Sequence, residues 1–565
     1  MKKTYLILLS LFTLTVTACN QASTNSSVSS DTIHTKSPTY FTWNNATIYF
    51  LLTDRFNNGN TSNDFVHPTS EPPAALRGFM GGDIKGVTQK INDGYFDSLG
   101  VNAIWTTPVN QNIEGSVDEG TGTSYAYHGY WPKDWTALDS RITSEKDYAE
   151  FVETAHKHGI RVIMDVIVNH TGPVTPLDEK WPDSWVRTKP KCKYDNAPNT
   201  ISCTLVENLP DVKTESTEEV ELPEFLVEKW KKEGRYEQEI EELDAFFKDT
   251  NYPRRPYYYI IKWLVDYIKE YGIDGFRVDT AKHTEEVVWK DLRREADKAF
   301  AEWKTKNPDK VLDDNEFYMV GEVYNYSLSS GRLFDYGDKK VDFYDQSFDA
   351  LVNFDFKSDA NSSYQTIFSK YQSALQYAFK DKSTLNYISS HDDGSPYDRE
   401  RKNPLDAGTK LLLTQGGAQI YYGDETARSL TAQANGDAQL RTLMNWDDLE
   451  KNKLLGRSTT REILTHWQKL GQFRQRHPSV GAGVQYNISD APYIFARRYV
   501  DKSFIDGVII ALEQPIGSKK IPVDFIFKDG ETVRDAYSGA TAVIKNGFAL
   551  INSFDKIVLL ETTIP

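Results

Sequence analysis

Three acidic residues of this chain each follow directly on a short apolar stretch that is typical of a buried β-strand. They are Asp279, Glu322 and Asp392. A carboxyl group at the end of a buried strand costs free energy unless it is paired with a cation or used in chemistry. One such residue alone would most simply be an ion-pair partner. Three of them at one edge of one sheet would indicate a reaction site.

Two carboxyl groups on either side of a bond can hydrolyse a glycosidic linkage. One attacks the anomeric carbon while the other protonates the leaving oxygen, and a separation of about 5–5.5 Å gives retention of configuration. Arg277 precedes Asp279 by two residues, so both side chains point to the same face of their strand. A guanidinium group in that place would keep Asp279 ionised, as a nucleophile requires.

The elements that must position these residues alternate between short apolar strands and longer amphipathic helices from about residue 46 onward. Helical patterns cover residues 85–99, 145–158, 261–268 and 460–476. Strand patterns cover residues 47–52, 103–107, 161–168, 274–278, 318–320, 351–356, 385–389 and 418–422. Eight strands separated mostly by helices predict an α/β fold, a (β/α)₈ TIM barrel, whose strand ends share one mouth.

The domain organisation follows from breaks in this rhythm. We expect barrel segments at residues 46–170 and 251–480. Residues 171–250 are rich in Pro, Asp, Glu and Lys, and a compact fold does not leave some eighty residues unstructured. They are therefore predicted to form a domain inserted after the third strand, with a charged helix near 222–247. Residues 481–565, rich in β-branched and aromatic types, are predicted to form an antiparallel β-sandwich.

The N-terminus has the pattern of an export signal. Residues 1–18 contain two lysines and then an apolar run that is too short for a membrane-spanning helix. Cys19 stands where a lipoprotein signal requires the cysteine that becomes lipidated, and residues 19–45 would then be a polar tether. Ordinary signal cleavage with an incidental Cys19 is the alternative. The protein is thus expected in the periplasm or on the cell surface, and otherwise secreted.

Charge and cysteine content limit the partners. A net charge of −16 argues against binding to nucleic acid or to an anionic membrane surface, so the lipid would be the only membrane contact. Aromatic residues make up 13% of the chain, which suits either an aromatic core or stacking faces for sugars. Cys192 and Cys203 are expected to form a disulfide in an oxidising compartment, with two unrelated thiols as the alternative.

Several short motifs together resemble the α-amylase family of glycoside hydrolases, over nearly all of the chain after the tether. In chain order these motifs are Tyr127–Trp131, Asp165–His170, Gly275–His283, Gly321–Val323, Ser390–Asp392 and Tyr421–Glu425. Among family members, periplasmic-type bacterial α-amylases are the most similar. The resemblance implies that Asp279 is the nucleophile, that Glu322 is the general acid/base, and that Asp392 stabilises the transition state.

The resemblance also implies which residues hold the sugar. The set that would contact the glucose at the scissile bond or orient Asp279 is His128, Tyr130, Trp131, His170, Arg277 and His391. Lys282 and His283 would contact the next glucose on the leaving-group side, which favours α-1,4 endo-cleavage of starch, glycogen and maltooligosaccharides. A monomer is expected.

Two rival functions remain at this point. The first is a cyclodextrin-acting or transglycosylating enzyme of the same family; cyclodextrin-forming members usually have further C-terminal domains, which a chain ending at residue 565 does not accommodate. The second is an inactive surface glycan-binding protein. That role predicts a lost catalytic carboxylate, whereas all three are present.

Calcium is the cofactor that the resemblance implies. One site would join Asn169, Asp211 and the backbone carbonyl of His283. A second would be formed by an Asn- and Gly-rich loop, which otherwise reads as a turn; its ligands would be Asn58, Asn60, Asn63, Asp64, Gly81 and Asp83. Ser390 stands where chloride-activated relatives have Asn, so no chloride is expected.

Overall fold

The computed structural model of the protein describes residues 40–562 except 381 and 503. The predicted signal peptide, Cys19 and most of the predicted tether lie outside the described residues. Residues 40–45, which we expected in the tether, are part of the fold. The ring of Trp43 stacks on that of Tyr318 with centroids 4.1 Å apart. This packing places Trp43 with the barrel strands rather than in a tether.

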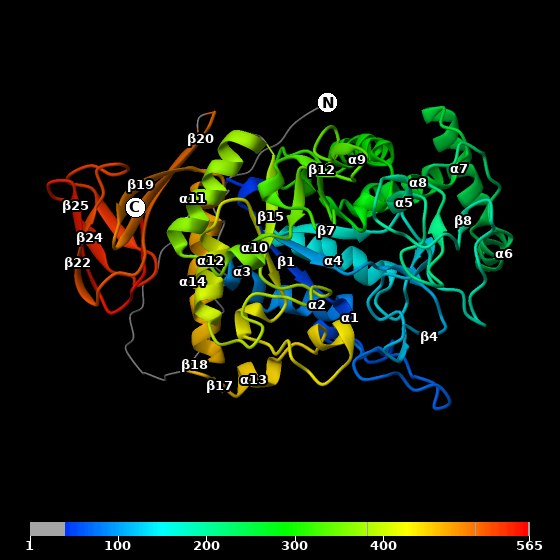
Figure 1. Cartoon of the computed structure of the whole chain (residues 1–565), viewed down its shortest axis with the longest axis horizontal. Coiled ribbons are helices and arrows are strands. Elements are labelled where there is room, and N and C mark those ends of the chain that lie inside the picture. The colour runs from blue at the N-terminus through cyan, green and yellow to red at the C-terminus, as the bar shows by residue number, and fades with distance from the viewer. Residues whose placement is uncertain (1–39, 381, 503, 563–565) are drawn as a thin grey trace, which may run out of the picture. The chain divides into compact units, whose positions relative to one another are not determined.

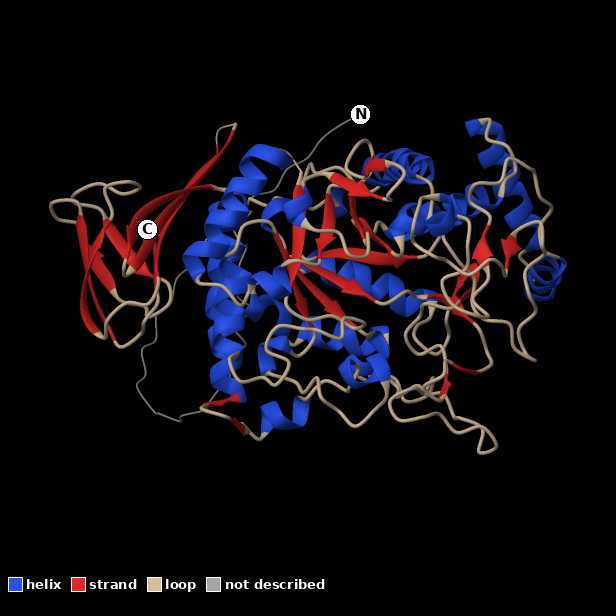
Figure 2. Cartoon of the chain, viewed as in Figure 1, coloured by secondary structure: helices blue, strands red, loops and turns tan. Residues whose placement is uncertain are grey.

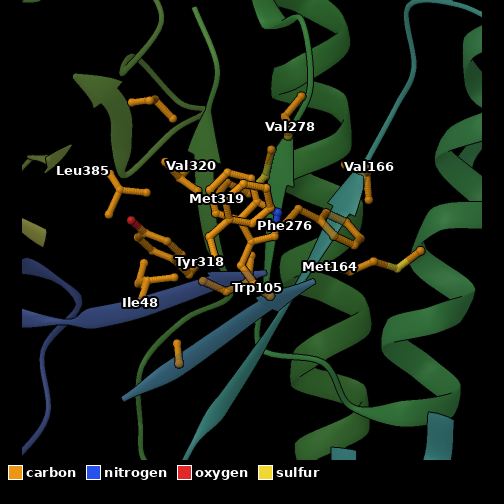
Figure 3. Close-up of a cluster of buried hydrophobic side chains, with 14 of the residues drawn as sticks. Ile48, Trp105, Met164, Val166, Phe276, Val278, Tyr318, Met319, Val320 and Leu385 are labelled. Atoms are coloured by element: carbon orange, nitrogen blue, oxygen red, sulfur yellow. The ribbon is translucent and has the colours of Figure 1, made fainter. Parts of the chain in front are cut away.

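Eight parallel strands in the described part of the chain close into a barrel in their chain order (Figure 1). They are β1 (Thr47–Leu51), β2 (Ala103–Thr106), β7 (Arg161–Val166), β10 (Gly275–Val278), β11 (Tyr318–Gly321), β14 (Ala350–Asn353), β15 (Ser383–Tyr387) and β16 (Gly417–Tyr421). This arrangement confirms the predicted TIM barrel. Apolar side chains of the strands, such as Phe276 and Met319, are fully buried (Figure 3).

Helices surround the barrel strands (Figure 2). They include α2 (Ile84–Asn92), α3 (Tyr95–Leu99), α4 (Glu145–Lys157), α8 (Pro256–Tyr271), α9 (Glu286–Lys306), α11 (Tyr364–Ala374), α12 (Pro404–Leu413) and α14 (Thr460–Arg476). The single helix predicted over 85–99 is wrong. The chain forms two helices there because Gly94, at the start of α3, has a left-handed φ of 73° that a continuous helix does not allow.

The segment between β7 and α8 contains β8 (Val186–Arg187), α5 (Pro198–Ile201), β9 (Asp211–Val212), α6 (Glu224–Glu233) and α7 (Tyr236–Thr250). The one helix predicted near 222–247 is likewise two, because Gly234 ends α6 at φ 75°. Tryptophans attach this segment to the barrel. The rings of Trp185 and Trp230 lie 6.1 and 6.4 Å from that of Trp263 on α8.

The C-terminal part of the described chain is antiparallel, as predicted. A six-stranded sheet has the order β19 (Val484–Asp490), β20 (Tyr493–Asp501), β21 (Phe504–Ala511), β26 (Val558–Thr562), β23 (Thr532–Asp535) and β24 (Thr541–Val543). A two-stranded sheet of β22 (Gly517–Pro522) and β25 (Phe548–Ser553) shares an apolar core with it. Within residues 40–562, no helix combines the length and apolar character that crossing a bilayer requires.

Candidate active site

The three acidic residues lie at the same end of the barrel, as the barrel architecture predicts. Asp279 directly follows β10, Glu322 directly follows β11, and Asp392 lies in the loop after β15. All three line one cavity of about 630 Å³. The other predicted site residues along its wall are His128, Tyr130, Trp131, His170, Lys282, His283 and His391. The structure therefore brings together residues from widely separated parts of the chain.

One buried guanidinium group holds three carboxyl groups beneath this cavity. Arg277 Nη1 lies 2.8 Å from Asp279 Oδ1 and 2.9 Å from Asp165 Oδ1. Its Nη2 lies 2.8 Å from Glu322 Oε2. The expected pairing of Arg277 with Asp279 is present. The link from Arg277 to Glu322 was not predicted, and it joins the two catalytic candidates through one side chain.

Asp165 is a functional residue that our sequence reasoning missed. It is fully buried, and its Oδ2 accepts hydrogen bonds from Tyr130 Oη at 2.8 Å and from Trp105 Nε1 at 3.0 Å. A signal was available, since Asp165 opens one of the resembling motifs and is the direct register partner of Arg277 across β7 and β10. Asp165 thus fixes the positions of both Arg277 and Tyr130.

The two catalytic candidates have different protonation states near neutral pH. Burial raises the pKa of Glu322 to about 8, against the opposing effect of Arg277. Burial also raises the pKa of Asp279 to about 6, with Arg277 lowering it and Asp165 raising it further. Between these values Asp279 is ionised and Glu322 is protonated. That is the division of labour between a nucleophile and a general acid.

The pH dependence of activity should show this division. We expect kcat/KM to fall as pH drops through about 6, because Asp279 becomes protonated, and to fall as pH rises through about 8, because Glu322 loses its proton. Initial rates on a soluble maltooligosaccharide across this range measure both limbs. A kcat/KM that stays constant below the pKa of Asp279 and above that of Glu322 would contradict the assignment.

Arg277 holds the carboxyl groups of Asp279 and Glu322 close together, and their separation determines the stereochemical outcome of the reaction. Asp279 and Glu322 bind neighbouring nitrogens of the same guanidinium, and a side-chain hydrogen bond from Glu322 lowers the pKa of Asp279. Carboxyl groups in such contact suit the retaining separation of about 5–5.5 Å better than the inverting one of about 6.5–9.5 Å, which must leave room for a water molecule.

Asp392 stays ionised in this cavity. Burial alone would raise its pKa, but the charges of Arg277 and Arg441 and the hydrogen bond from Ser390 lower the pKa below its usual value. Its side chain is 36% exposed, and Oδ1 accepts a hydrogen bond from Ser390 Oγ at 2.9 Å. An ionised carboxylate at the cavity wall can stabilise positive charge that develops on a sugar ring.

The cavity histidines are neutral, and they differ in what they offer a ligand. Burial lowers the pKa of His391 and of His170 to about 4. His391 Nδ1 is buried with no hydrogen-bond partner among the described residues, while its ring stacks on Tyr130 at 5.2 Å. His128 Nδ1 accepts from the Tyr130 backbone N–H at 3.0 Å, so its other nitrogen carries the proton.

His170 is the exception among these histidines. Its Nε2 lies 3.1 Å from the backbone carbonyl oxygen of Tyr130. A proton on that nitrogen is therefore donated to the protein itself. His170 lines the cavity as predicted, but this contact gives it a positioning role toward Tyr130 in addition to any contact with sugar.

The cavity walls on the two sides of the carboxyl groups contain residues that our sequence reasoning missed. On the Glu322 side, Lys282 Nζ donates to the backbone oxygen of Tyr324 at 3.1 Å. Elsewhere in the cavity wall, Arg441 Nε donates to the backbone oxygen of His391 at 2.9 Å. Arg77 reinforces the wall by pairing with Glu119 at 2.6 Å and with Asp437 at 2.9 Å, two cavity residues more than 300 positions apart.

The predicted primary calcium ligands do meet in the structure. The side-chain amide of Asn169 has one atom 2.7 Å from the carbonyl oxygen of His283 and 3.3 Å from Asp211 Oδ1. If that atom is the amide oxygen, three oxygens face one another, which is a cradle for a hard cation. If it is the amide nitrogen, it donates to both. Burial raises the pKa of Asp211 to about 9, although the nearby Arg187 lowers it. The protein therefore places too little positive charge beside this carboxyl group to keep it ionised.

The predicted ligands of the second calcium site lie together as well, with a mixed fit. Asn63 Oδ1 is buried with no hydrogen-bond partner among the described residues, as a metal ligand would be before binding. Asn58 Nδ2, however, donates to Asp64 Oδ1 at 2.8 Å. Asp83 caps α2 through Gly86 N and accepts further backbone N–H groups, which occupy its oxygens. No group of three or more His, Cys, Asp or Glu side chains in the described chain forms a metal cluster.

Comparisons with known proteins agree with this geometry. The sequence profile of a family described as "Alpha amylase, catalytic domain" matches residues 50–483. The chain is 35% identical over 521 residues to the periplasmic alpha-amylase of Escherichia coli (strain K12). The aligned region covers 82% of this chain and 71% of that protein. It is 26% identical over 511 residues to the cyclomaltodextrin glucanotransferase of Thermoanaerobacterium thermosulfurigenes, covering 88% of this chain and 64% of that one.

Solved structures show the same fold. An Anoxybacillus alpha-amylase has a TM-score of 0.63 at 22% identity and covers 93% of this chain and 100% of its own. CldA, a cyclomaltodextrin glucanotransferase with a three-domain ABC distribution, has a TM-score of 0.62 at 20% identity and covers 92% and 99%. The barrel, the paired carboxyl groups and the match of the family profile to most of the chain lead to one conclusion: this protein belongs to the α-amylase family of glycoside hydrolases.

Proposed function

We propose that this protein is an α-amylase that hydrolyses internal α-1,4-glucosidic bonds of α-glucans with retention of configuration. The observation that carries the proposal is the pair Asp279 and Glu322 on one guanidinium group, with the first ionised and the second protonated near neutral pH. The relative in Escherichia coli named as a periplasmic alpha-amylase supports the substrate class.

The reaction would proceed in two steps. Asp279 attacks the anomeric carbon and forms a glycosyl-enzyme ester, while Glu322 gives its proton to the departing glucosidic oxygen. Glu322, now ionised, takes a proton from water, which attacks the same carbon and releases Asp279. Asp392 stabilises the oxocarbenium-like charge in both transition states. His128, His391 and Tyr130 hold and stack on the sugar.

The products test this proposal. On maltoheptaose, the first-formed reducing ends should be α-anomers by NMR, and cleavage should occur at internal bonds. Initial formation of β-anomers would contradict retention, and release of a single short product from one chain end would contradict endo-cleavage. Assays on starch and on cyclodextrins in parallel measure the range of substrates.

A second candidate is a cyclodextrin-forming or transglycosylating enzyme. We expected such enzymes to need further C-terminal domains, but CldA is a cyclomaltodextrin glucanotransferase with three domains and matches 99% of its length to this chain. Domain number therefore does not separate the two functions. Cyclodextrins among the early products from starch would favour this candidate, whereas linear products alone support the α-amylase.

We further propose that calcium binds to Asn169, Asp211 and the carbonyl oxygen of His283, and that a second ion binds at the loop of Asn63. The fit of the first oxygen set and the unpaired Asn63 Oδ1 support these sites. Bound calcium would supply positive charge that neutralises Asp211, and it takes no part in the bond-breaking steps. The engaged oxygens of Asp83 make the second site the weaker fit.

Removing calcium should lower stability. An ion that binds only the folded state stabilises it by about 2.7 kcal/mol when its free concentration is about a hundred times Kd. Excess EDTA should therefore lower the melting temperature of the wild type, and added calcium should restore it. Asp211→Asn is the matched variant, whose melting temperature should respond much less to EDTA. A wild-type melting temperature that EDTA leaves unchanged would refute the first site.

We also propose that the protein acts outside the cytoplasm. The predicted signal, the disulfide between Cys192 and Cys203, and the periplasmic relative support export. A lipid on Cys19 remains a prediction because that residue lies outside the described residues. Membrane fractionation of the wild type beside a Cys19→Ala variant tests it: equal distribution of the two proteins would count against the anchor.

A further inference from the structure

The residue that follows Asp392 is buried and holds the Asp392 loop in place. Asp393 is 8% exposed, and both of its carboxylate oxygens have partners. Its Oδ2 forms an ion pair with Lys357 Nζ and accepts a hydrogen bond from Tyr387 Oη at 2.7 Å. Its Oδ1 accepts the backbone N–H of Ser395 at 3.0 Å. Asp393, Lys357 and Tyr387 do not line the cavity, so they are not in place to touch a sugar.

These contacts tie the loop to two neighbouring strands of the barrel. Tyr387 is the last residue of β15, and Lys357 lies on α10 (Phe356–Asp359), the short helix that follows β14. Strands β14 and β15 are hydrogen-bonded neighbours. The rings of Tyr387 and Phe354, which lies between β14 and α10, are in edge contact with centroids 5.7 Å apart. The carboxylate of Asp393 is therefore the point at which the loop joins this part of the barrel wall.

Asp392 depends on such neighbours for its direction. In the described part of the chain its carboxylate accepts one hydrogen bond, from Ser390 Oγ, and His391 Nε2 lies 3.7 Å away, beyond hydrogen-bonding distance. The backbone is fixed before Asp392 by the bond from Arg441 Nε to the His391 oxygen. It is fixed after Asp392 by the contacts of Asp393. The two anchors together set where the Asp392 side chain points.

The ion pair also bears on the charge around Glu322. Burial raises the pKa of Tyr387, and the charges of Asp393, Asp392 and Glu322 raise it further, so all three carboxyl groups act on one buried hydroxyl. The titratable groups that face Glu322 from the surrounding elements are Arg277, Asp279, Lys282, Tyr324, Tyr387 and Asp392. Negative neighbours in this set raise the pKa of Glu322. Lys357 offsets the negative charge that Asp393 would otherwise add.

We propose that Asp393 and Lys357 are positioning residues for the reaction. Their ion pair holds the loop so that Asp392 faces the sugar, and it keeps the charge of Asp393 from acting on Glu322. This proposal rests on the proposed function, because Asp392 and Glu322 have their catalytic roles only there. Both residues act through these two carboxyl groups and not on the sugar.

Loss of position should appear in kcat. Asp392 stabilises charge that develops only in the transition state, so its displacement weakens transition-state binding more than substrate binding. Asp393→Asn and Lys357→Met should each lower kcat on maltoheptaose about ten- to hundredfold and change KM less than about threefold. Lys357→Arg keeps the ion pair and should retain most of the activity. Tyr387→Phe removes one hydrogen bond, so it should lower kcat about two- to tenfold.

The alkaline limb of the pH profile reports the charge effect by its sign. Lys357→Met leaves Asp393 without its cation, so the pKa of Glu322 should rise and the alkaline limb of kcat/KM should move to higher pH by about 0.3–1 unit. Asp393→Asn leaves Lys357 without its anion and should move the same limb to lower pH. The double variant Lys357→Met/Asp393→Asn restores the net charge, so its limb should return close to that of the wild type while kcat stays low. A purely structural disturbance would not produce shifts of opposite sign.

Lys370→Met is the matched control. Lys370 Nζ pairs with Asp359 Oδ2 at 2.7 Å, on the same helix α10, and its loss should change neither kcat nor the alkaline limb. The double variant contains no uncompensated buried charge, so it gives the kcat result if a single variant does not fold. A kcat within twofold of the wild type in the variants of both residues, or limbs that move in the same direction in both, would overturn the proposal. Failure of the wild type to hydrolyse maltoheptaose would overturn the proposed function itself, and is a distinguishable result.

Discussion

Glu322→Gln is expected to lower kcat on starch by about 10²–10⁴-fold, because an amide cannot protonate the leaving oxygen. Asp279→Asn should lower kcat at least as much, because the covalent intermediate can no longer form. Steady-state rates with each purified variant measure both effects. Each substitution is nearly isosteric, so the melting temperatures should stay close to that of the wild type and show that folding is intact.

The two variants should differ with a substrate that needs no proton. When α-maltosyl fluoride is the donor, Glu322→Gln should still form the glycosyl-enzyme, since fluoride leaves without general acid catalysis. Asp279→Asn should remain inactive with the same donor. Glu316→Gln, whose carboxyl group is 86% exposed, is the control and should behave as the wild type. Wild-type turnover of starch by either catalytic variant would refute the assignment.

Arg277→Met is expected to have the largest effect on stability. Removing one partner of a buried ion pair costs about 3–5 kcal/mol, and three carboxyl groups depend on this one side chain. The loss should be smaller at low pH, where protonation of Asp165 and Asp279 removes the uncompensated charges. Chemical denaturation of the variant and the wild type at two pH values measures both the loss and its pH dependence.

Arg277→Lys separates charge from geometry in this comparison. An ammonium group keeps the positive charge but lacks the planar fork that binds several carboxyl groups at once. We therefore expect this variant to retain much of the stability while losing most of the activity, because Asp279 and Glu322 are no longer held by one group. An active, fully stable Arg277→Met protein would show that the bridge is not needed.

The fold could be predicted because the spacing of the apolar residues and the length of each segment are enough to distinguish strands from helices. Alternation of apolar strands with amphipathic helices located all eight barrel strands, including β1 and β16, which close the barrel. Two of the errors fell where one residue overrides a helical pattern. Gly94 and Gly234 each take a left-handed conformation that splits a predicted helix in two, and hydrophobic periodicity does not report φ.

Only those site residues that stand at the end of a predicted strand could be identified from the sequence. Asp279, Glu322 and Asp392 were found because each stands at an identifiable boundary. The bridge from Arg277 to Glu322 depends on the register of β10 against β11, which strand patterns do not give. The contacts of Arg77 with Glu119 and Asp437 join positions far apart in the chain, and no local spacing indicates them.

The oxygen cradle of Asn169, Asp211 and His283 also has a consequence for heat inactivation. Its three members come from the loops that follow β7 and β10 and from β9 in the intervening segment, and His283 also lines the cavity. The segment between β7 and α8 packs on the barrel through an apolar core that includes Trp185 and Trp230, so the cradle is a polar link at the cavity, and its loss would loosen the cavity wall while the barrel stays folded. Starch-degrading activity would then be lost at a lower temperature than the one at which the barrel melts, and calcium would narrow that gap.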